Sequence, residues 1–254
     1  MSILKLTISL LLAALFAVGP GLAATGSWNG IAFTAWNGVA VTSWNGTSIS
    51  TGGGGLAAFS DDFDRADSDS LGPNWTEADG DADIHSNTLR LSEGGFGENF
   101  PIYTGEACTT VNQYVLFTLV NAAGYPQIPL RYTNSSSPFY FLEFSGSSVD
   151  WYHKSQIGGT STQVNAVSGS ISVTDGITLG MTVTGTGNST EVKVWTSFSG
   201  GYSPSDPTTW GAATVTFTDN PASPVDAGGY VGLGGVQGSA DTLRINNFYG
   251  GDVP

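Results

Sequence analysis

Basic residues are scarce in this sequence. Its 254 residues include 7 Lys and Arg against 21 Asp and Glu, which gives a formal net charge of −14 at pH 7. Binding to the phosphates of nucleic acid requires a basic patch, so nucleic acid is not an expected partner. An acidic surface of this kind suits solubility, calcium binding or saline surroundings.

Cysteine and histidine are almost absent as well. The single cysteine, Cys108, has no partner for an internal disulfide, so the chain depends on its core or on metal for stability. We interpret Cys108 as a buried structural thiol rather than a nucleophile. Neither His85 nor His153 has a Gly-x-Ser-x-Gly or similar nucleophile motif nearby, which argues against a hydrolytic triad.

A long apolar run occurs only at the N-terminus. Residues 1–24 contain Lys5, an apolar stretch from Ile8 to Val18, and a terminal Leu22-Ala23-Ala24. This is the pattern of a secretory signal peptide. The stretch is shorter than the roughly 20 residues of a membrane span. We therefore expect cleavage and secretion, with no membrane span in the remaining chain.

Charged residues are missing between Thr25 and Phe59, where a Trp-Asn-Gly motif recurs every eight residues. Asn-Gly is a strong signal for a two-residue hairpin turn, because both of its positions accept positive φ. Residues 25–50 are therefore predicted to form a short β-hairpin ribbon, with strands Ile31–Trp36 and Val39–Trp44. Similar short x-N-G repeats occur near the ends of phage-tail and cell-surface proteins.

Both faces of this predicted ribbon are largely apolar, and a lone ribbon is marginal in water. It must pair with another copy, with a cell-surface partner, or with its own sandwich. Residues 51–58, which include four consecutive glycines, are predicted to be a flexible linker that lets the ribbon extend away from its own sandwich. The candidate assembly residues are Trp28, Phe33, Trp36, Val41 and Trp44.

Residues 59–254 have the pattern of an all-β domain. Gly, Ser and Thr clusters separate many short alternating segments, and no stretch has helical periodicity. An alternating strand is also expected at Ile84–Leu91, with Leu89 and Leu91 on one side and Arg90 on the other. The other expected strands are Val111–Val120, Gln127–Thr133, Phe139–Phe144, Val149–His153, Ile177–Thr184, Glu191–Phe198, Ala213–Phe217, Tyr230–Leu233 and Leu243–Phe248.

The two ends of this domain carry the clearest motifs. It opens with the run FSDDFDRADSDSLGPNWT from Phe59 and closes with GGYVGLGG from Gly228, followed by a strand from Leu243. This pattern resembles β-sandwich domains of the concanavalin A-like lectin/glucanase superfamily, of the kind found in bacteria and phages. The resemblance implies an antiparallel jelly-roll β-sandwich whose closing strand pairs near the first. It implies little about substrate, because this superfamily carries many functions.

Glycoside hydrolysis requires two carboxylates across a cleft. The glucanase members of this superfamily carry them as an E-x-D-x-x-E run on one strand, and this chain has no such run. Glu143 and Asp150 are seven residues apart, and no further acids follow Glu191 on its strand. We therefore expect a protein that is not an enzyme, with glycoside hydrolysis as a weaker alternative.

Aspartates crowd the opening of the domain between Asp61 and Asp83. Calcium prefers several oxygen ligands on a bent loop, although the spacing does not match an EF-hand. The cluster could hold a structural calcium ion or form a solvated loop in which Asp acts as a turn former. The resemblance implies a calcium site near the paired termini, with Asp62 or Asp64 acting with Asp241.

Aromatic rings are the other candidate binding groups, because the C–H face of a sugar packs on a ring. Adjacent strand residues face opposite ways, so one of Trp151 and Tyr152 should lie in the core and the other could be exposed. The candidate carbohydrate-binding residues are Trp151, Tyr152, Trp195, Tyr202 and Trp210.

Together these features favour a secreted, non-catalytic surface or matrix protein. Its sandwich would bind a glycan or cell-surface polymer, and its ribbon would attach or assemble it into a homo-oligomer. The first alternative is a structural subunit of an extracellular fibre or phage-like appendage that assembles by strand addition. The second is a glycan-acting enzyme.

Overall fold

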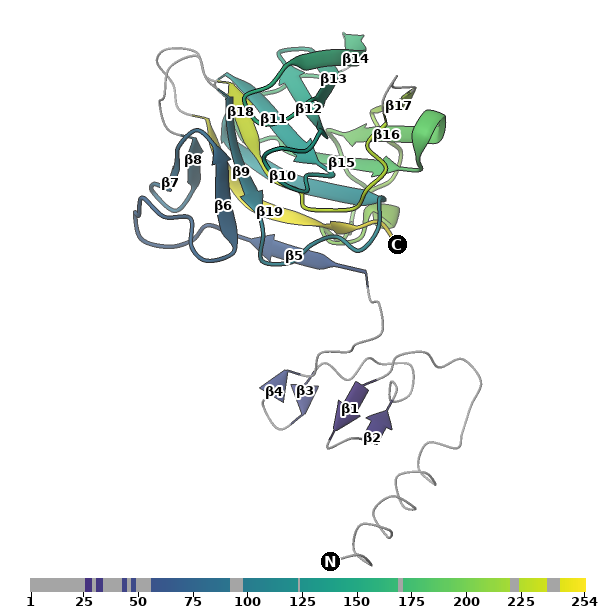
Figure 1. Cartoon of the computed structure of the whole chain (residues 1–254). Coiled ribbons are helices and arrows are strands. Elements are labelled where there is room, and N and C mark those ends of the chain that lie inside the picture. Colours follow the sequence, from purple (N-terminus) through teal and green to yellow (C-terminus); the bar gives the residue numbers. More distant parts are fainter. Residues whose placement is uncertain are drawn as a thin grey trace, which may run out of the picture. The chain divides into compact units, whose positions relative to one another are not determined.

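The computed structural model describes residues 26–28, 31–33, 43–44, 47–48, 56–91, 98–122, 124–168, 171–219, 224–236 and 243–254. It divides into two compact units, Met1–Gly55 and Leu56–Pro254, each of which we describe by itself (Figure 1). The predicted signal peptide, residues 1–24, lies outside the described residues. No helix among the described residues is long and apolar enough to cross a membrane.

The smaller unit contains two short antiparallel strand pairs. Strand β1 (Gly26–Trp28) pairs with β2 (Ile31–Phe33), and β3 (Ser43–Trp44) pairs with β4 (Thr47–Ser48). Two residues separate the strands of each pair, and in both cases they are Asn-Gly, as the hairpin signal predicts. The expected pairing about Asn37-Gly38, with Trp36 and Val41, lies outside the described residues.

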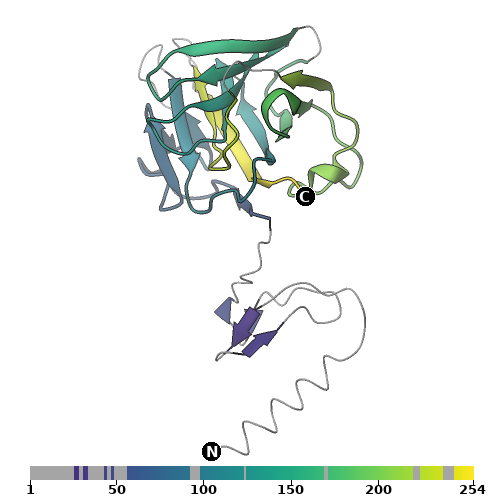
Figure 2. The same ribbon diagram turned by 45° about the vertical axis from the view of Figure 1, so that its right-hand side comes forward.

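The larger unit is a sandwich of two antiparallel sheets, and Figures 1 and 2 show its two layers. The eight-stranded sheet runs β17-β16-β15-β10-β19-β8-β7, and β5 also pairs with β19. Its strands are β5 (Ala58–Asp61), β7 (Ala82–Ile84), β8 (Leu89–Leu91), β10 (Gln113–Asn121), β15 (Thr178–Thr184), β16 (Thr190–Trp195), β17 (Val215–Asp219) and β19 (Arg244–Asp252).

The seven-stranded sheet runs β14-β13-β12-β11-β18-β9-β6. Its strands are β6 (Trp75–Asp79), β9 (Glu98–Tyr103), β11 (Tyr125–Leu130), β12 (Phe139–Ser145), β13 (Ser148–Lys154), β14 (Ser161–Ser168) and β18 (Gly234–Val236). Two short 3-10 helices, Gly187–Ser189 and Pro207–Thr209, complete the described elements. The predicted all-β, antiparallel jelly-roll sandwich is confirmed.

Alternation along the strands separates the core from the outer faces. In β12, Tyr140, Leu142 and Phe144 belong to the main core between the sheets, whereas Phe139 and Phe141 belong to a second cluster. We call the side of the seven-stranded sheet that carries this second cluster its outer face. Because strand residues point alternately to opposite sides, each residue's place on a strand decides whether it packs in the core or faces outward.

The closing strand behaves as expected, since β19 pairs with β5 through Phe248 opposite Asp61 to Gly251 opposite Ala58. The buried Ala57 packs into the core just before β5, so the sandwich begins slightly before Phe59. Tyr230 and Gly232 form only isolated bridges, and the regular strand β18 begins at Gly234. Strands β6, β9 and β14 were not among the strands predicted from the sequence.

The single strand predicted at Ile84–Leu91 is wrong, because this segment turns back on itself. Ser86 and Asn87 have φ of 52° and 58°, and Ile84 pairs with Leu89 across the turn. Positive φ at both central positions is typical of a two-residue hairpin. Ser-Asn carries no glycine, so the turn was not recognised. Leu89 and Leu91 nevertheless face the core as predicted.

Candidate functional site

Three of the aromatic residues predicted to bind sugar lie in the interior. Trp151 and Trp210 are fully buried and Trp195 is 5% exposed. Trp151 stacks on Tyr140 between the sheets, with ring centroids 4.7 Å apart. Trp195 and Trp210 meet edge to face at 5.2 Å, in a cluster on the far side of the eight-stranded sheet. Their rings are packed against protein and are not open platforms.

The two predicted tyrosines are half-buried and lie in different places. Tyr202 stacks on Phe198 in the cluster of Trp195 and Trp210, with centroids 4.6 Å apart. Tyr152 lies on the outer face of the seven-stranded sheet and stacks nearly parallel on Phe141, at 4.8 Å and 7°. Alternation therefore divides Trp151 and Tyr152 between core and surface, as predicted. Tyr152 is the predicted residue that remains on a sheet surface with other polar groups.

A row of polar side chains crosses four neighbouring strands beside Tyr152. We call this the polar row; it consists of Gln127, Glu143, Asp150 and Gln163, from β11, β12, β13 and β14 in turn. Gln127 Nε2 donates to Glu143 Oε2 at 2.7 Å, and Gln163 Nε2 donates to Asp150 Oδ1 at 3.1 Å. The row thus has an amide at each end and two carboxylates between them, and these groups can both donate to and accept from a hydroxylated ligand.

Sequence reasoning looked for acids on one strand and missed this pair on two strands. Glu143 lies directly opposite Asp150 in the β12–β13 pairing. Ser145 pairs with Ser148 at the end of the same hairpin, and Gly146 between them has φ of 59°. Gly-Ser is a two-residue hairpin signal, and it could have given this register from the sequence. Cross-strand partners lie about 4.5–5.5 Å apart at Cβ.

The environment of Glu143 shifts the pKa of its carboxyl above the ordinary value. Burial raises the pKa of this carboxyl, the hydrogen bond from Gln127 lowers it, and the charges of Asp150 and Glu98 raise it further, so the net direction is upward. Burial, followed by the charges of Glu143 and Asp150, also raises the pKa of the Tyr152 phenol. The two carboxylates and the ring therefore form one electrostatically coupled site.

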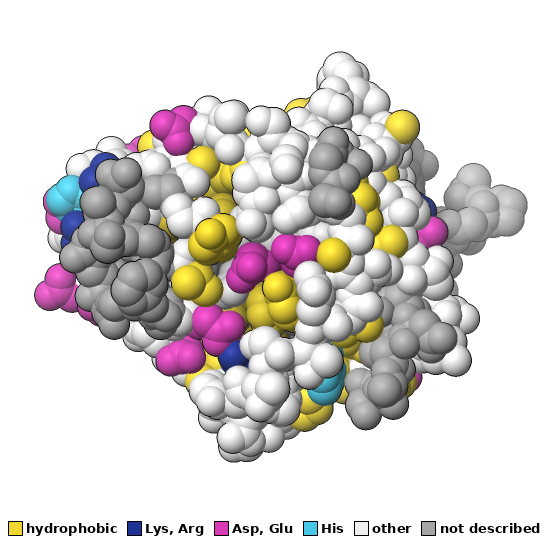
Figure 3. Space-filling model, turned by 90° about the horizontal axis from the view of Figure 1, so that it is seen from above, with side chains coloured by type: hydrophobic (Ala, Val, Ile, Leu, Met, Phe, Trp, Pro, Cys, Tyr) yellow, Lys and Arg dark blue, Asp and Glu magenta, His cyan; other side chains and the backbone are white. Residues whose placement is uncertain are grey.

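Beside the polar row lies an ion pair whose lysine is buried and whose glutamate is partly exposed. Lys154 is 2% exposed, and its Nζ pairs with Glu98 and lies over the ring of Phe100 at 5.9 Å. Figure 3 views this face from the side of β12 to β14. Acidic side chains border apolar ones around a hollow near its middle, with a basic side chain at the edge. The face thus combines an aromatic floor with polar groups around it.

No family model matches the sequence, and no curated protein matches it. Among solved structures, the chain is similar to the carbohydrate-binding module CBM66 from Bacillus subtilis, with a TM-score of 0.46 and 11% identity over 68% of this chain and 91% of that chain. It is also similar to the lectin UEA-II complexed with galactose, with a TM-score of 0.46 and 12% identity over 78% and 99%.

The exoplasmic/lumenal domain of VIP36, in its Ca²⁺/Man3GlcNAc-bound form, has a TM-score of 0.43 and 12% identity over 70% of this chain and 83% of that chain. At such low identities the likeness concerns the fold alone. What this chain binds must follow from its own residues.

Of the predicted calcium ligands, Asp62 and Asp64 lie in the described part of the chain. Asp62 and Asp64 are exposed, and Asp62 Oδ1 accepts a hydrogen bond from the backbone of Asp64 at 3.1 Å, as a turn former does. The described residues contain no group of three or more His, Cys, Asp or Glu that could hold a metal ion. Asp241 lies outside the described residues, so its role stays a prediction.

The opening motif instead has a structural explanation centred on Asp61. Its carboxylate accepts hydrogen bonds from Arg65 Nη1 at 2.7 Å and from Trp75 Nε1 at 2.8 Å, and also from the backbone of Phe63 at 2.9 Å. Arg65 in turn donates to the carbonyl of Leu71 at 2.7 Å. The hydrogen bonds of Asp61 therefore connect strand β5, where Asp61 lies, to Trp75 at the start of β6.

A second carboxylate, Asp252, fastens the end of the domain. It is 2% exposed and accepts from the backbone of Ala57 at 2.8 Å, and from both the backbone and the hydroxyl of Thr109 and Thr110 at 2.7–3.0 Å. Burial alone would raise the pKa of Asp252, but these hydrogen bonds outweigh it, and the pKa lies below its ordinary value. In this region, hydrogen-bonded carboxylates join the segments near the termini.

Cys108 is buried, as predicted, and burial strongly raises the pKa of its thiol. A thiol that stays protonated is a poor nucleophile. This agrees with a structural role.

Proposed function

We propose that the sandwich of this protein binds glycan, and that it does so through the outer face of the seven-stranded sheet. The observation that carries the proposal is the polar row, two neighbouring carboxylates between two amides, beside the half-buried ring of Tyr152. Sugars present an apolar C–H face and a rim of hydroxyls. A site for them needs a ring for the first and mixed donors and acceptors for the second.

The fixed geometry of this face supports such a role. Tyr152 is held in place by stacking on the buried Phe141, and hydrogen bonds within the polar row hold its amides and carboxylates in position. Side chains that are already ordered lose little conformational freedom when a ligand binds. The face would therefore bind a saccharide without first having to be rearranged.

Replacing Tyr152 by alanine should weaken glycan binding by about tenfold or more, because the stacking platform is lost. The measurement is titration calorimetry with an oligosaccharide that the wild-type protein binds on a glycan array. Tyr202→Ala is the matched control, since Tyr202 is also a half-buried, stacked tyrosine but belongs to the far side of the eight-stranded sheet. Equal binding by Tyr152→Ala, with its fold intact by circular dichroism, would remove this face from the proposal.

A second candidate function is glycoside hydrolysis, and the specific observation in its favour is the Glu143–Asp150 pair. Hydrolysis uses a protonated acid beside an ionised carboxylate, and Glu143 is the acid whose pKa is raised. The two functions separate in one assay for new reducing ends on the bound glycan. Release that stops in Glu143→Gln supports hydrolysis, and retention without release supports binding alone.

We further propose that the chain is exported and that residues 25–55 serve attachment or assembly. Deleting these residues should leave the sandwich folded with an unchanged melting temperature, because the two units are compact by themselves. It should also abolish self-association, measured by light scattering, because edge strands that carry no charged side chains pair readily with other chains. If the full chain stays monomeric over a wide concentration range and the deletion lowers its melting temperature, the ribbon instead belongs to its own sandwich.

A further inference from the structure

The two carboxylates of the polar row have no basic counterpart in the part of the chain that the structure describes. Neither Glu143 nor Asp150 takes part in an ion pair among the described residues. Lys154, the lysine on this face, is already engaged, because its Nζ pairs with Glu98 and lies 3.3 Å from Ser161 Oγ. The site therefore presents uncompensated negative charge, within a chain whose net charge is −14.

Gln127 supplies an independent sign that a ligand group belongs here. Gln127 is 1% exposed, and its Oε1 atom is buried without a hydrogen-bond partner in the described structure, while its Nε2 donates a hydrogen bond to Glu143. Buried polar atoms are nearly always hydrogen-bonded, and an exception calls for an explanation. A donor group placed next to Glu143 would supply the missing hydrogen bond.

These features together favour a ligand that donates hydrogen bonds and carries positive charge. The negative face of the Tyr152 ring attracts a cation as well as the C–H face of a sugar. Ionised carboxylates bind an ammonium group more strongly than a neutral hydroxyl, because the hydrogen bonds are charge-assisted. They also repel a carboxylate or sulfate on the ligand.

We propose that the outer face selects saccharides built from 2-amino-2-deoxyhexose units with free, protonated amino groups, and that Glu143 and Asp150 hold the ammonium. This inference rests on the proposed glycan-binding function. It specifies the class of sugar that is bound. N-acetylation of the same unit removes the positive charge of the amino group, and a uronic acid carries a negative charge instead.

The test compares three oligosaccharides of equal length by titration calorimetry with the full chain: a glucosamine oligomer, an N-acetylglucosamine oligomer and a galacturonate oligomer. The buffer is mildly acidic, so that the amines are protonated, and the positive charge of a bound ammonium favours the ionised form of Glu143. We expect the glucosamine oligomer to bind at least about tenfold more tightly than the N-acetylated one, which corresponds to about 1.4 kcal/mol. The galacturonate oligomer should bind more weakly still, and added salt should reduce the preference for glucosamine.

The decisive variant is Asp150→Asn, which keeps a hydrogen-bond acceptor for Gln163 but removes the charge. It should lose most of the preference for glucosamine and retain binding to the N-acetylated oligomer. Asp64→Asn is the matched control, because it removes one exposed acid elsewhere and changes the net charge equally. Equal affinity for the two oligomers, or an undiminished preference in Asp150→Asn, would overturn the inference and leave the proposed function standing. Failure to bind any saccharide on a broader array would overturn both.

Discussion

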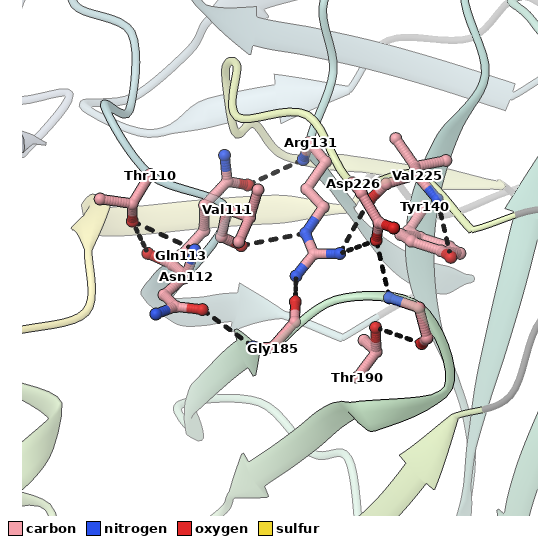
Figure 4. A network of polar contacts seen from close by, with 11 residues as sticks. Thr110, Val111, Asn112, Gln113, Arg131, Tyr140, Gly185, Thr190, Val225 and Asp226 are labelled. Atoms are coloured by element: carbon pink, nitrogen blue, oxygen red, sulfur yellow. Dashed lines mark hydrogen bonds and ion pairs between the residues drawn. The ribbon is translucent and has the colours of Figure 1, made fainter.

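Replacing Arg131 by methionine is expected to destabilise the sandwich by about 3–5 kcal/mol, the usual cost of removing one member of a buried charged network. Arg131 is fully buried, and its guanidinium donates to the carbonyls of Val111 at 3.0 Å, Val225 at 2.8 Å and Gly185 at 2.6 Å. The carboxylate of Asp226 lies 3.8 Å away. Figure 4 shows the guanidinium at the centre of these contacts.

The size of the effect follows from what methionine cannot replace. It fills a similar volume but donates no hydrogen bond, so three carbonyls from three separate segments lose their donor together. A domain is stable by only about 5–15 kcal/mol, and the melting temperature should fall by about 10 °C.

The measurement is urea unfolding of Arg131→Met beside Lys193→Met. Lys193 is partly exposed and pairs with Glu191, and a surface pair of this kind contributes less than about 1 kcal/mol. Comparable losses in the two variants would mean that the charge at position 131, rather than its buried network, is what matters.

Asp252→Asn should be the second most damaging substitution, costing about 2–3 kcal/mol at neutral pH. The carboxylate accepts five hydrogen bonds from Ala57, Thr109 and Thr110. An asparagine of the same shape would turn its amide nitrogen toward some of these donors. The segment before β5 and the segment before β10 would then be less firmly joined to the closing strand.

This loss should depend on pH in a definite direction. The pKa of Asp252 is lower in the folded protein than its ordinary value of about 3.9, so the folded state binds fewer protons than the unfolded state. The stabilisation is present above that value and is lost as the pH falls through the lower, folded-state pKa. The difference in unfolding free energy between wild type and Asp252→Asn should therefore be smaller near pH 3 than at pH 7. A difference that stays constant with pH would contradict the role of the ionised carboxylate.

Some features of the site were within reach of the sequence, and others were not. The division of Trp151 and Tyr152 between core and surface follows from strand alternation alone. The Glu143–Asp150 pair also follows from local information, because a two-residue turn after Ser145 sets the register of the hairpin. That Tyr152, rather than Trp210, keeps a partly exposed ring depends on which loops cover each sheet, and single-strand patterns carry no such information.

The paired termini show the same limit. The acidic opening motif suggested metal ligands, but Asp61 accepts hydrogen bonds from Arg65 and Trp75 within its own segment. Asp252 accepts from residues more than 140 positions away. Whether a carboxylate faces a cation, a backbone amide or solvent depends on the arrangement of distant segments.

The sequence by itself determined the all-β class, the positions of most central strands, the pairing of the last strand with the first and the Asn-Gly hairpin spacing. Each of these follows from local rules of alternation and turn chemistry, or from motifs at the two ends. The tertiary structure decided which rings are buried and which carboxylates form ion pairs among the described residues. It also placed Arg131 in the interior, where it binds three loops. These are outcomes of packing between segments far apart in the chain, because burial and charge pairing belong to the neighbours a side chain meets, not to its place in the sequence.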